Sequence, residues 1–263
     1  MPEGHTIHRI AGDHSKILRG RIIAVSSPQG RFAADAALVD GVRLRAIEAY
    51  GKHLFYYWRN GLVGHVHLGL FGRFRVYPGP GPLDAPTVRM RMEVAKATID
   101  LIGPTECSIG TMEDRDQIVR RLGPDPLRSD ADPDKAYAAI ARRVAPIGQL
   151  LLEQKVISGL GNVYRAEALF VNGINPRRPG NQITRDEFDR LWATIVGMLE
   201  RGVAEDRIVT LDREQFDVPG GVARRGDTTY VYHRDLCLRC GNPIQIVELG
   251  GRACYYCPVD QPR

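Results

Sequence analysis

The chain has 263 residues, 43% of them hydrophobic and 25% charged, which is the composition of an ordinary folded protein long enough for two domains. It contains no run of about 18 or more apolar residues, which excludes a membrane-spanning helix. The net charge is +5 with 36 basic side chains, which favours a polyanionic partner, although arginine-rich codon usage would produce the same balance.

The first part of the chain is predicted to be one helix followed by short antiparallel strands. Residues 6–19 place their apolar side chains on one helical stripe, and Gly20 provides a stop. His5 and His8 are expected at the surface of this helix. The next segments are short, rich in β-branched or aromatic residues, and separated by Gly, Pro or Asn; they are 21–27, 42–49, 53–60, 62–69, 73–77 and 88–102. Such a series predicts a β-sandwich or barrel.

Helices replace strands after about residue 115. Helical patterns are expected at 116–122, 134–143, 148–156, 162–172 and 185–201. The last begins with a capping box of Thr184 and Glu187. Residues 203–229 show no strong period, which predicts a loop or short strands. We therefore expect an N-terminal β domain at 1–115, a linker at 116–133, a helical domain at 134–230 and a cysteine-bearing hairpin at 231–263.

Four of the five cysteines lie in the last 27 residues. The N-terminus has no apolar signal-peptide core, so we expect an intracellular, cytoplasmic protein in which clustered cysteines bind metal instead of forming disulfides. Cys237 and Cys240 form one CxxC pair, and Cys254 and Cys257 form a second pair after 13 residues. Paired CxxC motifs near this spacing indicate one structural zinc ion.

The sequence SGLGN at 158–162 joins two predicted helical segments. Its glycines would let backbone N–H groups approach a ligand, and the N-terminus of the following helix favours an anion such as phosphate. A plain helix–helix turn would use the same glycines. This motif alone therefore leaves both interpretations open.

Two further features lie among the predicted strands. Lys52 stands between Gly51 and an apolar strand, where a lysine is usually an ordinary solvated residue. Leu70 and Phe71 lie between glycines in a predicted turn, where exposing large apolar side chains costs hydration free energy. These two side chains either pack back onto the core or insert between the bases of DNA.

In this order, the motifs resemble the formamidopyrimidine-DNA glycosylase/endonuclease VIII family of base-excision repair enzymes. The resemblance rests on MPEG at 1–4, GKHL at 51–54, LGPDPL at 122–127, ISGLGNVYRAEALF at 157–170 and the terminal CxxCG, GGR and YC. It implies an α+β multidomain protein with an N-terminal β-sandwich and flanking helices, a helix–two-turn–helix domain and a C-terminal zinc-finger β-hairpin.

The resemblance implies that the chemistry is carried by the start of the chain. After removal of the methionine, the amine of Pro2 would attack C1′ of a damaged nucleotide and form an iminium, which permits β- and then δ-elimination. An α-amino group has a pKa of about 7.7–8.0 and is therefore partly neutral at pH 7. Glu3 resembles the carboxylate that manages protons, and Lys52 resembles the lysine that contacts phosphate and assists departure of the base.

Four other residues match the DNA-binding positions of the family. Asn162 and Arg252 resemble the pair that grips the phosphates of the lesion. Leu70 and Phe71 occupy the place of side chains that fill the gap left by the extruded base. The implied partner is damaged DNA and the implied zinc is structural. We expect a monomer, since nothing in the sequence indicates an oligomer interface.

The implied function is a bifunctional DNA glycosylase and abasic-site lyase. Gly4 favours the endonuclease VIII branch, in which MPEG is typical, so oxidised pyrimidines and abasic sites are the expected substrates. Oxidised purines are a second possibility. A different class of function also fits: a non-catalytic protein that binds damaged DNA through a zinc-braced clamp and has lost the chemistry.

The sequence departs from the family pattern at two places. Endonuclease VIII proteins commonly carry glutamate where this chain has Thr6, a change that either alters proton handling or makes Thr6 a helix cap. The family's fourth zinc ligand falls on Asp260 instead of a cysteine. We favour Cys254 as the fourth ligand because its thiolate is soft, with Asp260 and then His233 as alternatives. In a regular strand, however, positions 254 and 257 point to opposite faces.

Overall fold

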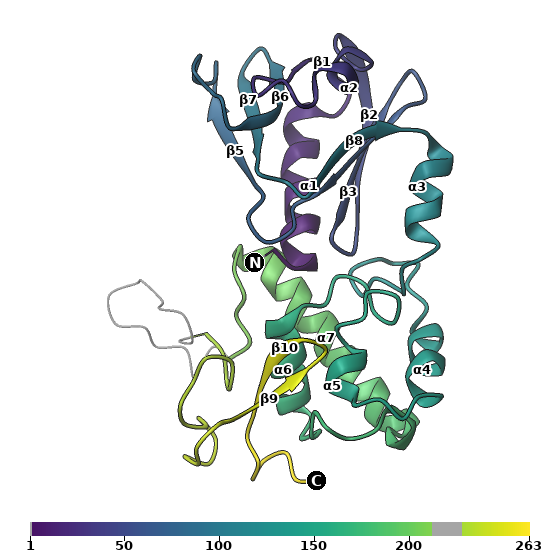
Figure 1. Ribbon diagram of the computed structural model, residues 1–263, viewed down its shortest axis with the longest axis vertical. Helices are drawn as coiled ribbons and strands as arrows, with labels where there is room; N and C mark the ends of the chain where they lie inside the picture. Colours follow the sequence, from purple (N-terminus) through teal and green to yellow (C-terminus); the bar gives the residue numbers. More distant parts are fainter. Residues whose placement is uncertain (1, 212–227) are drawn as a thin grey trace. The chain divides into compact units, whose positions relative to one another are not determined.

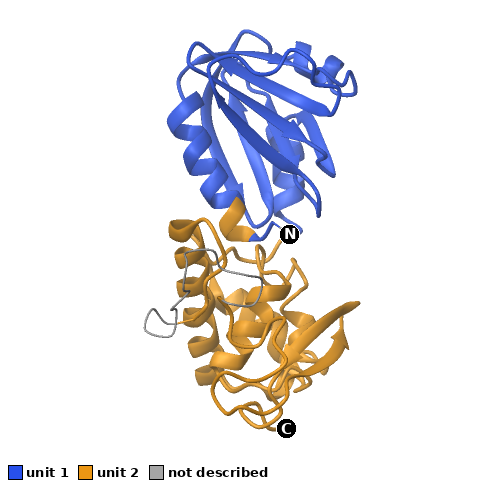
Figure 2. Ribbon diagram, turned by 90° about the vertical axis from the view of Figure 1, so that its left-hand side faces the viewer, with its two compact units in different colours: residues 1–3, 7–121 blue, residues 4–6, 122–263 orange. Residues whose placement is uncertain are grey.

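The computed structural model describes residues 2–211 and 228–263 (Figure 1). The chain divides into two compact units, which are coloured differently in Figure 2. Unit 1 consists of residues 1–3 and 7–121, and unit 2 of residues 4–6 and 122–263. Among the described residues, no helix is long and apolar enough to cross a membrane.

The chain begins with helix α1, Gly4–Leu18. Ile7, Ala11, His14 and Leu18 are buried at helical spacing, so one face of α1 contributes to the core. The residue before the helix is Glu3, whose backbone is extended. Thr6 therefore lies inside the first turn, and its predicted role as a cap is wrong.

Eight strands of unit 1 form one antiparallel sheet in the order β5-β7-β6-β1-β2-β3-β4-β8. Their bounds are β1 Ile22–Ser26, β2 Val42–Tyr50, β3 His53–Trp58, β4 Val63–His67, β5 Arg73–Pro78, β6 Val88–Val94, β7 Ala97–Ile102 and β8 Glu106–Gly110. Only two residue pairs join β1 to β2, so the sheet has two halves. Leu54 and Val66 from one half share a core cluster with Met92 and Leu101 from the other. The sheet is therefore folded over a common core, and the predicted β-sandwich is confirmed.

Local patterns missed three elements of unit 1. The predicted segment 88–102 is a hairpin of β6 and β7, and neither β8 nor the short helix α2, Ala33–Ala37, was expected. Strand β8 is an edge strand paired with β4 alone, and none of its residues is fully buried, so it lacks an alternating pattern. Helix α3, Met112–Val119, begins earlier than predicted, at a capping box of Thr111 and Asp114.

Unit 2 is helical and ends in a hairpin (Figure 1). Its elements are α4 Pro133–Ala141, α5 Ile147–Leu150, α6 Asn162–Val171, the 3₁₀ helix η1 Gly180–Gln182, α7 Arg185–Glu205, and strands β9 Gln245–Leu249 and β10 Arg252–Tyr256. The capping box of Thr184 and Glu187 is confirmed at the start of α7. The helix predicted at 148–156 is limited to the single turn of α5, and turns occupy the rest.

Residues 212–227, which make up most of the segment 203–229 predicted as a loop or short strands, lie outside the described residues. A buried carboxylate binds the chain on both sides of them. Glu167, on α6, is fully buried. It accepts hydrogen bonds from the Thr210 hydroxyl at 2.5 Å and from the backbone N–H groups of Tyr230, Val231 and Tyr232 at 2.6–2.9 Å. Burial raises the pKa of Glu167, while these donors act in the opposite direction.

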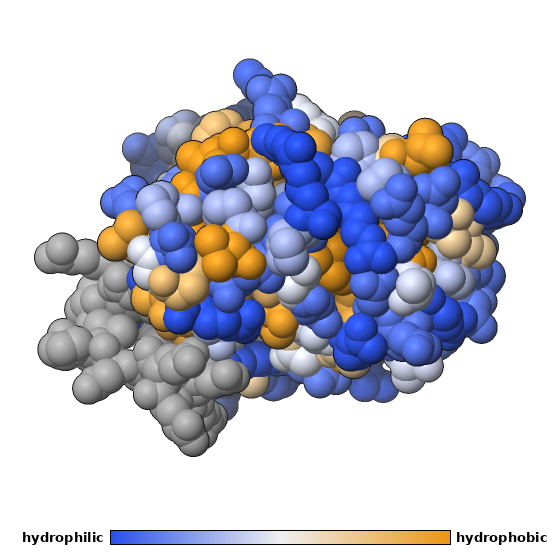
Figure 3. Space-filling view, turned by 90° about the horizontal axis from the view of Figure 1, so that it is seen from below, coloured by the Kyte–Doolittle hydropathy of each residue, from blue (hydrophilic) through white to orange (hydrophobic). Residues whose placement is uncertain are grey.

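On the face seen in Figure 3, hydrophobic residues form small separate areas among hydrophilic ones. Scattered apolar side chains of this kind are normal for a protein surface and do not indicate a docking site.

Candidate functional site

The start of the chain is held by a backbone contact within unit 2. The N–H of Gly4 donates to the carbonyl oxygen of Gly159 at 2.8 Å. A Cβ added to Gly4 would lie 3.0 Å from the Cα of Gly159, which is tighter than most real Cβ contacts. Directly before Gly4, Glu3 is buried and Pro2 is partly exposed. Gly4 therefore serves close packing against the glycine turn.

His5 is buried, not at the surface, so that prediction is wrong. Its ring meets the Tyr164 ring edge-on, with centroids 5.3 Å apart, and its Nε2 lies 3.1 Å from the Thr6 hydroxyl. A Cβ on Gly202 would lie 2.1 Å from the Tyr164 hydroxyl and 2.9 Å from the His5 ring. Burial lowers the pKa of His5 to about 4, so the imidazole is neutral at physiological pH.

Lys52 lies in the turn between β2 and β3, after Gly51, which has a φ of 57°. Three histidines gather on the same sheet face beyond it. Nδ1 of His53 lies 2.9 Å from Nε2 of His65, and the His53 and His67 rings are 4.9 Å apart. Burial is the main cause that lowers the pKa of His53 to about 3 and that of His65 to about 4. The cluster therefore adds no positive charge beside Lys52 at neutral pH.

Sequence reasoning missed this histidine cluster. The signal was available, because His65 and His67 alternate along one predicted strand and His53 begins the preceding strand. In the antiparallel pairing His53 stands opposite His67, which brings the three rings to one face.

Leu70 and Phe71 project from the β4–β5 turn, with 57% and 81% of their surface exposed. The flanking glycines make this turn tight. A Cβ on Gly69 would lie 1.8 Å from the Thr105 hydroxyl, and one on Gly72 would lie 2.3 Å from the Leu68 carbonyl oxygen. Packing of these two side chains back onto the core is therefore ruled out, and they are available to a partner.

The side chain of Gln154 makes two hydrogen bonds to the backbone of the glycine turn. Gln154 accepts a hydrogen bond from the Gly159 N–H at 3.0 Å and donates to the Leu160 carbonyl at 2.9 Å. The Gly159 N–H is therefore already paired within the protein, so it is not one of the backbone groups offered to a ligand. Helix α6 begins at Asn162, just after these hydrogen bonds, and Gly161 is its N-cap.

Asn162 lies against the C-terminal hairpin. Its Nδ2 donates to the Ala253 carbonyl at 2.9 Å, and its Oδ1 accepts from the Arg165 guanidinium. Arg252, the residue before Ala253, is exposed at the start of β10, immediately after the Gly250–Gly251 turn. Unit 2 thus brings together Asn162 and the segment that carries Arg252.

Three thiols and a carboxylate converge at the base of the hairpin. The ligand atoms of Cys237, Cys240, Cys257 and Asp260 all lie within 4.8 Å of one another. The sulfurs of Cys240 and Cys257 are 3.4 Å apart, and the sulfur of Cys237 is 3.1 Å from an Asp260 oxygen. Tetrahedral zinc with Zn–S bonds of about 2.3 Å separates its sulfur ligands by about 3.8 Å. The donor set and its spacing therefore fit a four-coordinate structural zinc site.

The preference for Cys254 as the fourth ligand is wrong. Cys254 lies within β10, opposite Val247, whereas Cys257 follows the end of that strand, so the two thiols do not share a face. Cys254 is buried outside the cluster, and burial raises the pKa of its thiol. His233 also lies outside the cluster, against the rings of Tyr232 and Tyr255.

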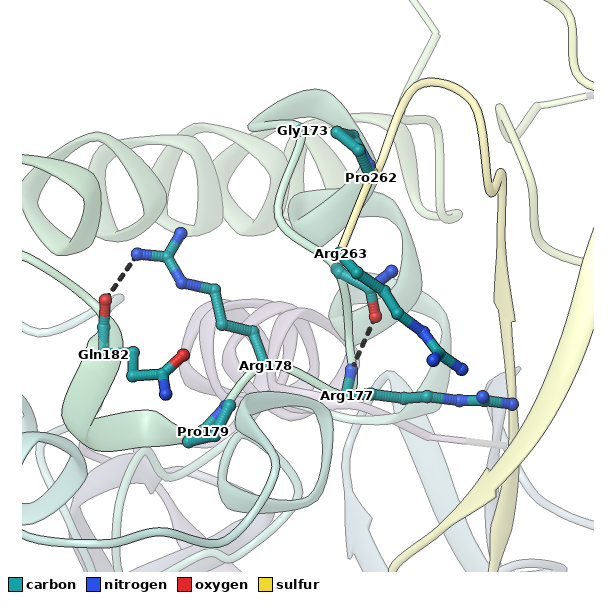
Figure 4. Close-up of a pocket in the computed structure, with 8 residues that line it drawn as sticks. Gly173, Arg177, Arg178, Pro179, Gln182, Pro262 and Arg263 are labelled. Atoms are coloured by element: carbon teal, nitrogen blue, oxygen red, sulfur yellow. Dashed lines mark hydrogen bonds between the residues drawn. The ribbon is translucent and has the colours of Figure 1, made fainter.

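Unit 2 also has a hollow of about 680 Å³ lined by Gly173, Asn175, Arg177, Arg178, Pro179, Gln182, Pro262 and Arg263. Figure 4 shows Arg178 reaching toward Gln182, while Arg177 and Arg263 extend in the other direction. The Arg178 guanidinium also makes a paired contact with Glu187, which neutralises its charge. None of the residues predicted as site residues lines this hollow, so it is separate from the candidate site.

Comparisons with known proteins cover both units. Residues 1–104 match the formamidopyrimidine-DNA glycosylase N-terminal domain, and residues 122–213 match the formamidopyrimidine-DNA glycosylase H2TH domain. The chain is 46% identical over 269 residues to Endonuclease 8 1 of Mycobacterium tuberculosis, covering 99% of this chain and 100% of that protein. It is 29% identical over 278 residues to a formamidopyrimidine-DNA glycosylase of Desulfitobacterium hafniense, covering 99% and 98%.

Solved structures show the same architecture. A complex of the Lactococcus lactis glycosylase Fpg with abasic-site DNA aligns with a TM-score of 0.82 and 21% identity, covering 99% of this chain and 100% of that one. The Fpg protein of Thermus thermophilus aligns with a TM-score of 0.78 and 26% identity, covering 99% and 98%. The predicted fold class of sandwich, helical domain and cysteine-bearing hairpin is confirmed.

Proposed function

The chain belongs to the formamidopyrimidine-DNA glycosylase/endonuclease VIII family, and we propose that it acts through the secondary amine of Pro2. It is a DNA glycosylase and abasic-site lyase of base-excision repair. A protein that binds damaged DNA without chemistry is not favoured. The observation that carries the mechanism is the hydrogen bond from Gly4 to Gly159, because it fixes the residue from which Glu3 and Pro2 extend.

Pro2 supplies the nucleophile once Met1 has been removed. The amine lone pair bonds to C1′ of the damaged nucleotide, and the bond from C1′ to the base breaks, with the base leaving as its protonated form. Opening of the sugar ring leaves an iminium between the Pro2 nitrogen and C1′. This cation takes up the electrons released when a C2′ proton is removed, and the 3′ phosphate then departs. Removal of a C4′ proton into the resulting conjugated iminium expels the 5′ phosphate in the same way.

Glu3 and Lys52 support these steps. The Glu3 carboxylate lies next to the nucleophile and moves protons during ring opening and elimination. Its position at the N-terminus of α1 supports this role, because the helix dipole favours a negative charge there. Lys52, in the β2–β3 turn, contacts a phosphate and assists departure of the base.

Four further residues hold the DNA. Asn162 and Arg252 grip the phosphates beside the lesion, which is supported by the contact between Asn162 and the segment that carries Arg252. Leu70 and Phe71 fill the space left by the extruded base, which is supported by their exposure in a rigid turn. We infer that damaged DNA is the partner.

One structural zinc ion is held by Cys237, Cys240, Cys257 and Asp260. When bound, zinc crosslinks these side chains and contributes folding free energy. Those residues come from the segment before the hairpin and from the segment that follows β10. They therefore support the position of Arg252 and take no part in the chemistry.

Oxidised pyrimidines and abasic sites are the proposed substrates. Gly4 and the 46% identity to a protein named Endonuclease 8 1 support this choice over oxidised purines. Single-turnover excision rates on matched duplexes with thymine glycol or 8-oxoguanine decide between the two.

The mechanism is tested by reductive trapping. Incubation with abasic-site DNA and borohydride should give a covalent protein–DNA adduct, and peptide mapping should place the linkage on Pro2. The Pro2→Gly variant tests whether the ring amine is needed, and intact mass spectrometry establishes beforehand that Met1 is absent. An adduct on another side chain, or none from processed protein, rejects the mechanism.

A further inference from the structure

Arg165 is the largest fully buried side chain of the described residues, with 0% of its surface exposed. It lies on α6, whose other core-facing residues are mostly apolar. Removing a guanidinium from water is costly unless its N–H groups find acceptors. The buried guanidinium of Arg165 therefore needs hydrogen-bond acceptors that offset its loss of hydration.

The acceptors come from three separate parts of unit 2. Nη1 donates to the carbonyls of Gly148 in α5 and Leu249 in β9, both at 3.0 Å. Nη2 donates to the carbonyl of Ala253 in β10 at 3.1 Å and to Oδ1 of Asn162. These four acceptors are neutral oxygens, and the guanidinium serves them as a fixed fork of donors.

This fork fixes the orientation of Asn162. Arg165 has only donors, so the oxygen of the Asn162 amide must face it. The amide nitrogen then faces the Ala253 carbonyl and donates one hydrogen to it. The second hydrogen on Nδ2 is left for a ligand, and a phosphate oxygen is an acceptor of the right kind.

The same fork holds the hairpin at its turn. Leu249 and Arg252 are the cross-strand pair that flanks Gly250 and Gly251. Arg165 contacts the Leu249 carbonyl on one strand and the Ala253 carbonyl on the other, with the Arg252 carbonyl 3.5 Å from Nη2. A lysine has a single donor nitrogen and could not span both strands and Asn162 in one plane.

We propose that Arg165 is a positioning residue that presents Asn162 and Arg252 together to the backbone of damaged DNA. The inference rests on the proposed phosphate grip. It adds that the grip depends on a buried residue that touches no DNA. Loss of Arg165 should therefore resemble loss of Asn162 in binding, even when the fold and the zinc site are intact.

The test measures binding of the full chain to a duplex that contains a tetrahydrofuran abasic-site analogue, which requires no chemistry. The variants are Arg165→Met, Arg165→Lys, Asn162→Ala and the double variant Arg165→Met with Asn162→Ala. Arg178→Met is the matched control, because Arg178 makes a comparable paired contact with Glu187 in the same unit. Thermal unfolding and zinc content are measured for each protein.

Arg165→Met should weaken binding about 10- to 100-fold, as expected for loss of a charge-assisted contact. The double variant should be within about twofold of Arg165→Met, because loss of Arg165 already removes the Asn162 contact and coupled residues are not additive. The slope of log affinity against log salt should fall by about 0.9, the value for one phosphate contact. Arg178→Met should keep the affinity and slope of the unmutated protein.

The inference is overturned if Arg165→Met binds the DNA as tightly as the unmutated protein. It is also overturned if the affinity loss of the double variant equals the product of the two single losses, or if Arg165→Met leaves the salt slope unchanged. If Arg165→Met does not fold, Arg165→Lys is judged by the same three criteria. Unchanged binding by Asn162→Ala removes both the grip and the inference. Failure of the proline mechanism is separate, since it appears only as a missing borohydride adduct.

Discussion

The N–H of Gly4 donates to the carbonyl oxygen of Gly159 across 2.8 Å, and a Cβ on Gly4 would crowd the Gly159 backbone at 3.0–3.3 Å. This contact joins two motifs that are more than 150 residues apart in the sequence. By sequence alone, the first motif resembles a reactive chain end, and the second is either a phosphate-binding turn or a plain helix–helix turn. The hydrogen bond links the two motifs structurally, because the glycine turn holds Gly4, two residues after Pro2.

Gly4→Ala should therefore impair the chemistry more than the fold. The new Cβ would lie 3.0 Å from Gly159 Cα and 3.1 Å from its carbonyl oxygen, and neither backbone atom can rotate away. Overpacking of this kind costs about 1–3 kcal/mol. We expect at least a tenfold lower rate of borohydride adduct formation with abasic-site DNA.

Gly12→Ala is the matched control for Gly4→Ala. Gly12 lies on the same helix, and its Cβ would meet nothing within 4 Å. Alanine there should stabilise the protein by about 0.5–1 kcal/mol and leave adduct formation unchanged. Equal adduct rates for the two variants would contradict the anchoring role of Gly4.

Phe71→Ala should lower excision from duplex DNA without changing stability. Phe71 is 81% exposed, so truncation leaves no cavity in the fold, and the free energy of unfolding should change by less than about 0.5 kcal/mol. Excision of thymine glycol from a duplex should slow by about tenfold or more, because the gap left by the base is no longer filled. The effect should be smaller on single-stranded DNA, which has no gap to fill.

The control for Phe71→Ala is Leu83→Ala, since Leu83 is also a fully exposed apolar residue of unit 1. Single-turnover rates on both substrates measure the difference. An equal loss on duplex and single strand, or an equal loss in the Leu83 variant, removes the assigned role.

Asp260→Ala should weaken zinc retention, whereas Cys254→Ser should not. Asp260 stands with the thiols of Cys237, Cys240 and Cys257, while Cys254 is outside the group. Loss of a direct ligand should lower zinc affinity by more than the 10- to 100-fold typical of supporting residues. Asp260→Cys should retain zinc at least as well as the unmutated chain. Each variant is dialysed against a chelator, and its zinc content is then measured with a colorimetric dye. Loss of zinc from the Cys254→Ser protein would show that Cys254, and not Asp260 alone, is a ligand.

The fold was largely predictable from local patterns. The stripe of α1, the alternating strands of the sandwich and the capping box at Thr184 each depend on residues near one another in the sequence. Short-range spacing is enough to specify such elements. The edge strand β8 was missed because its five residues carry no alternation and its position depends on β4, about 40 residues away.

The site was predictable in residue type but not in geometry. Asp260 joins the cysteines because the chain turns back after Cys257, where the Gln261 N–H donates to the Cys257 carbonyl and the Gln261 side chain accepts from the Cys257 N–H. CxxC spacing does not encode that turn. Arg165 resembles any helical arginine in the sequence, and its burial depends on carbonyls 84–88 residues further along the chain.

Unit 1 should lose stability in mild acid because His14 is buried without charge. Its Nδ1 lies 2.7 Å from the Tyr56 hydroxyl, and the Phe74 ring packs edge-on at 4.6 Å. Burial lowers the pKa of His14 from 6.5 to about 4, with the neighbouring Asp13 acting weakly in the opposite direction. Below pH 6.5 the unfolded chain therefore binds a proton that the folded chain rejects until about pH 4. Stability that is fully present above pH 6.5 is lost as the pH falls through this window, by about 3 kcal/mol for this residue.

His14→Gln should remove that part of the pH dependence, because glutamine does not titrate. Urea unfolding of unit 1 can be followed through Trp58, a core residue, in a Trp192→Phe background that silences the only other tryptophan. Between pH 7 and pH 4.5 the variant should lose up to about 3 kcal/mol less than the parent. The remaining slope of the variant is expected from three partly buried histidines of this unit, whose pKa values desolvation also lowers: His53, His65 and His67. Parallel slopes for parent and variant would show that His14 is not the acid-sensitive group, whatever the stability difference at pH 8.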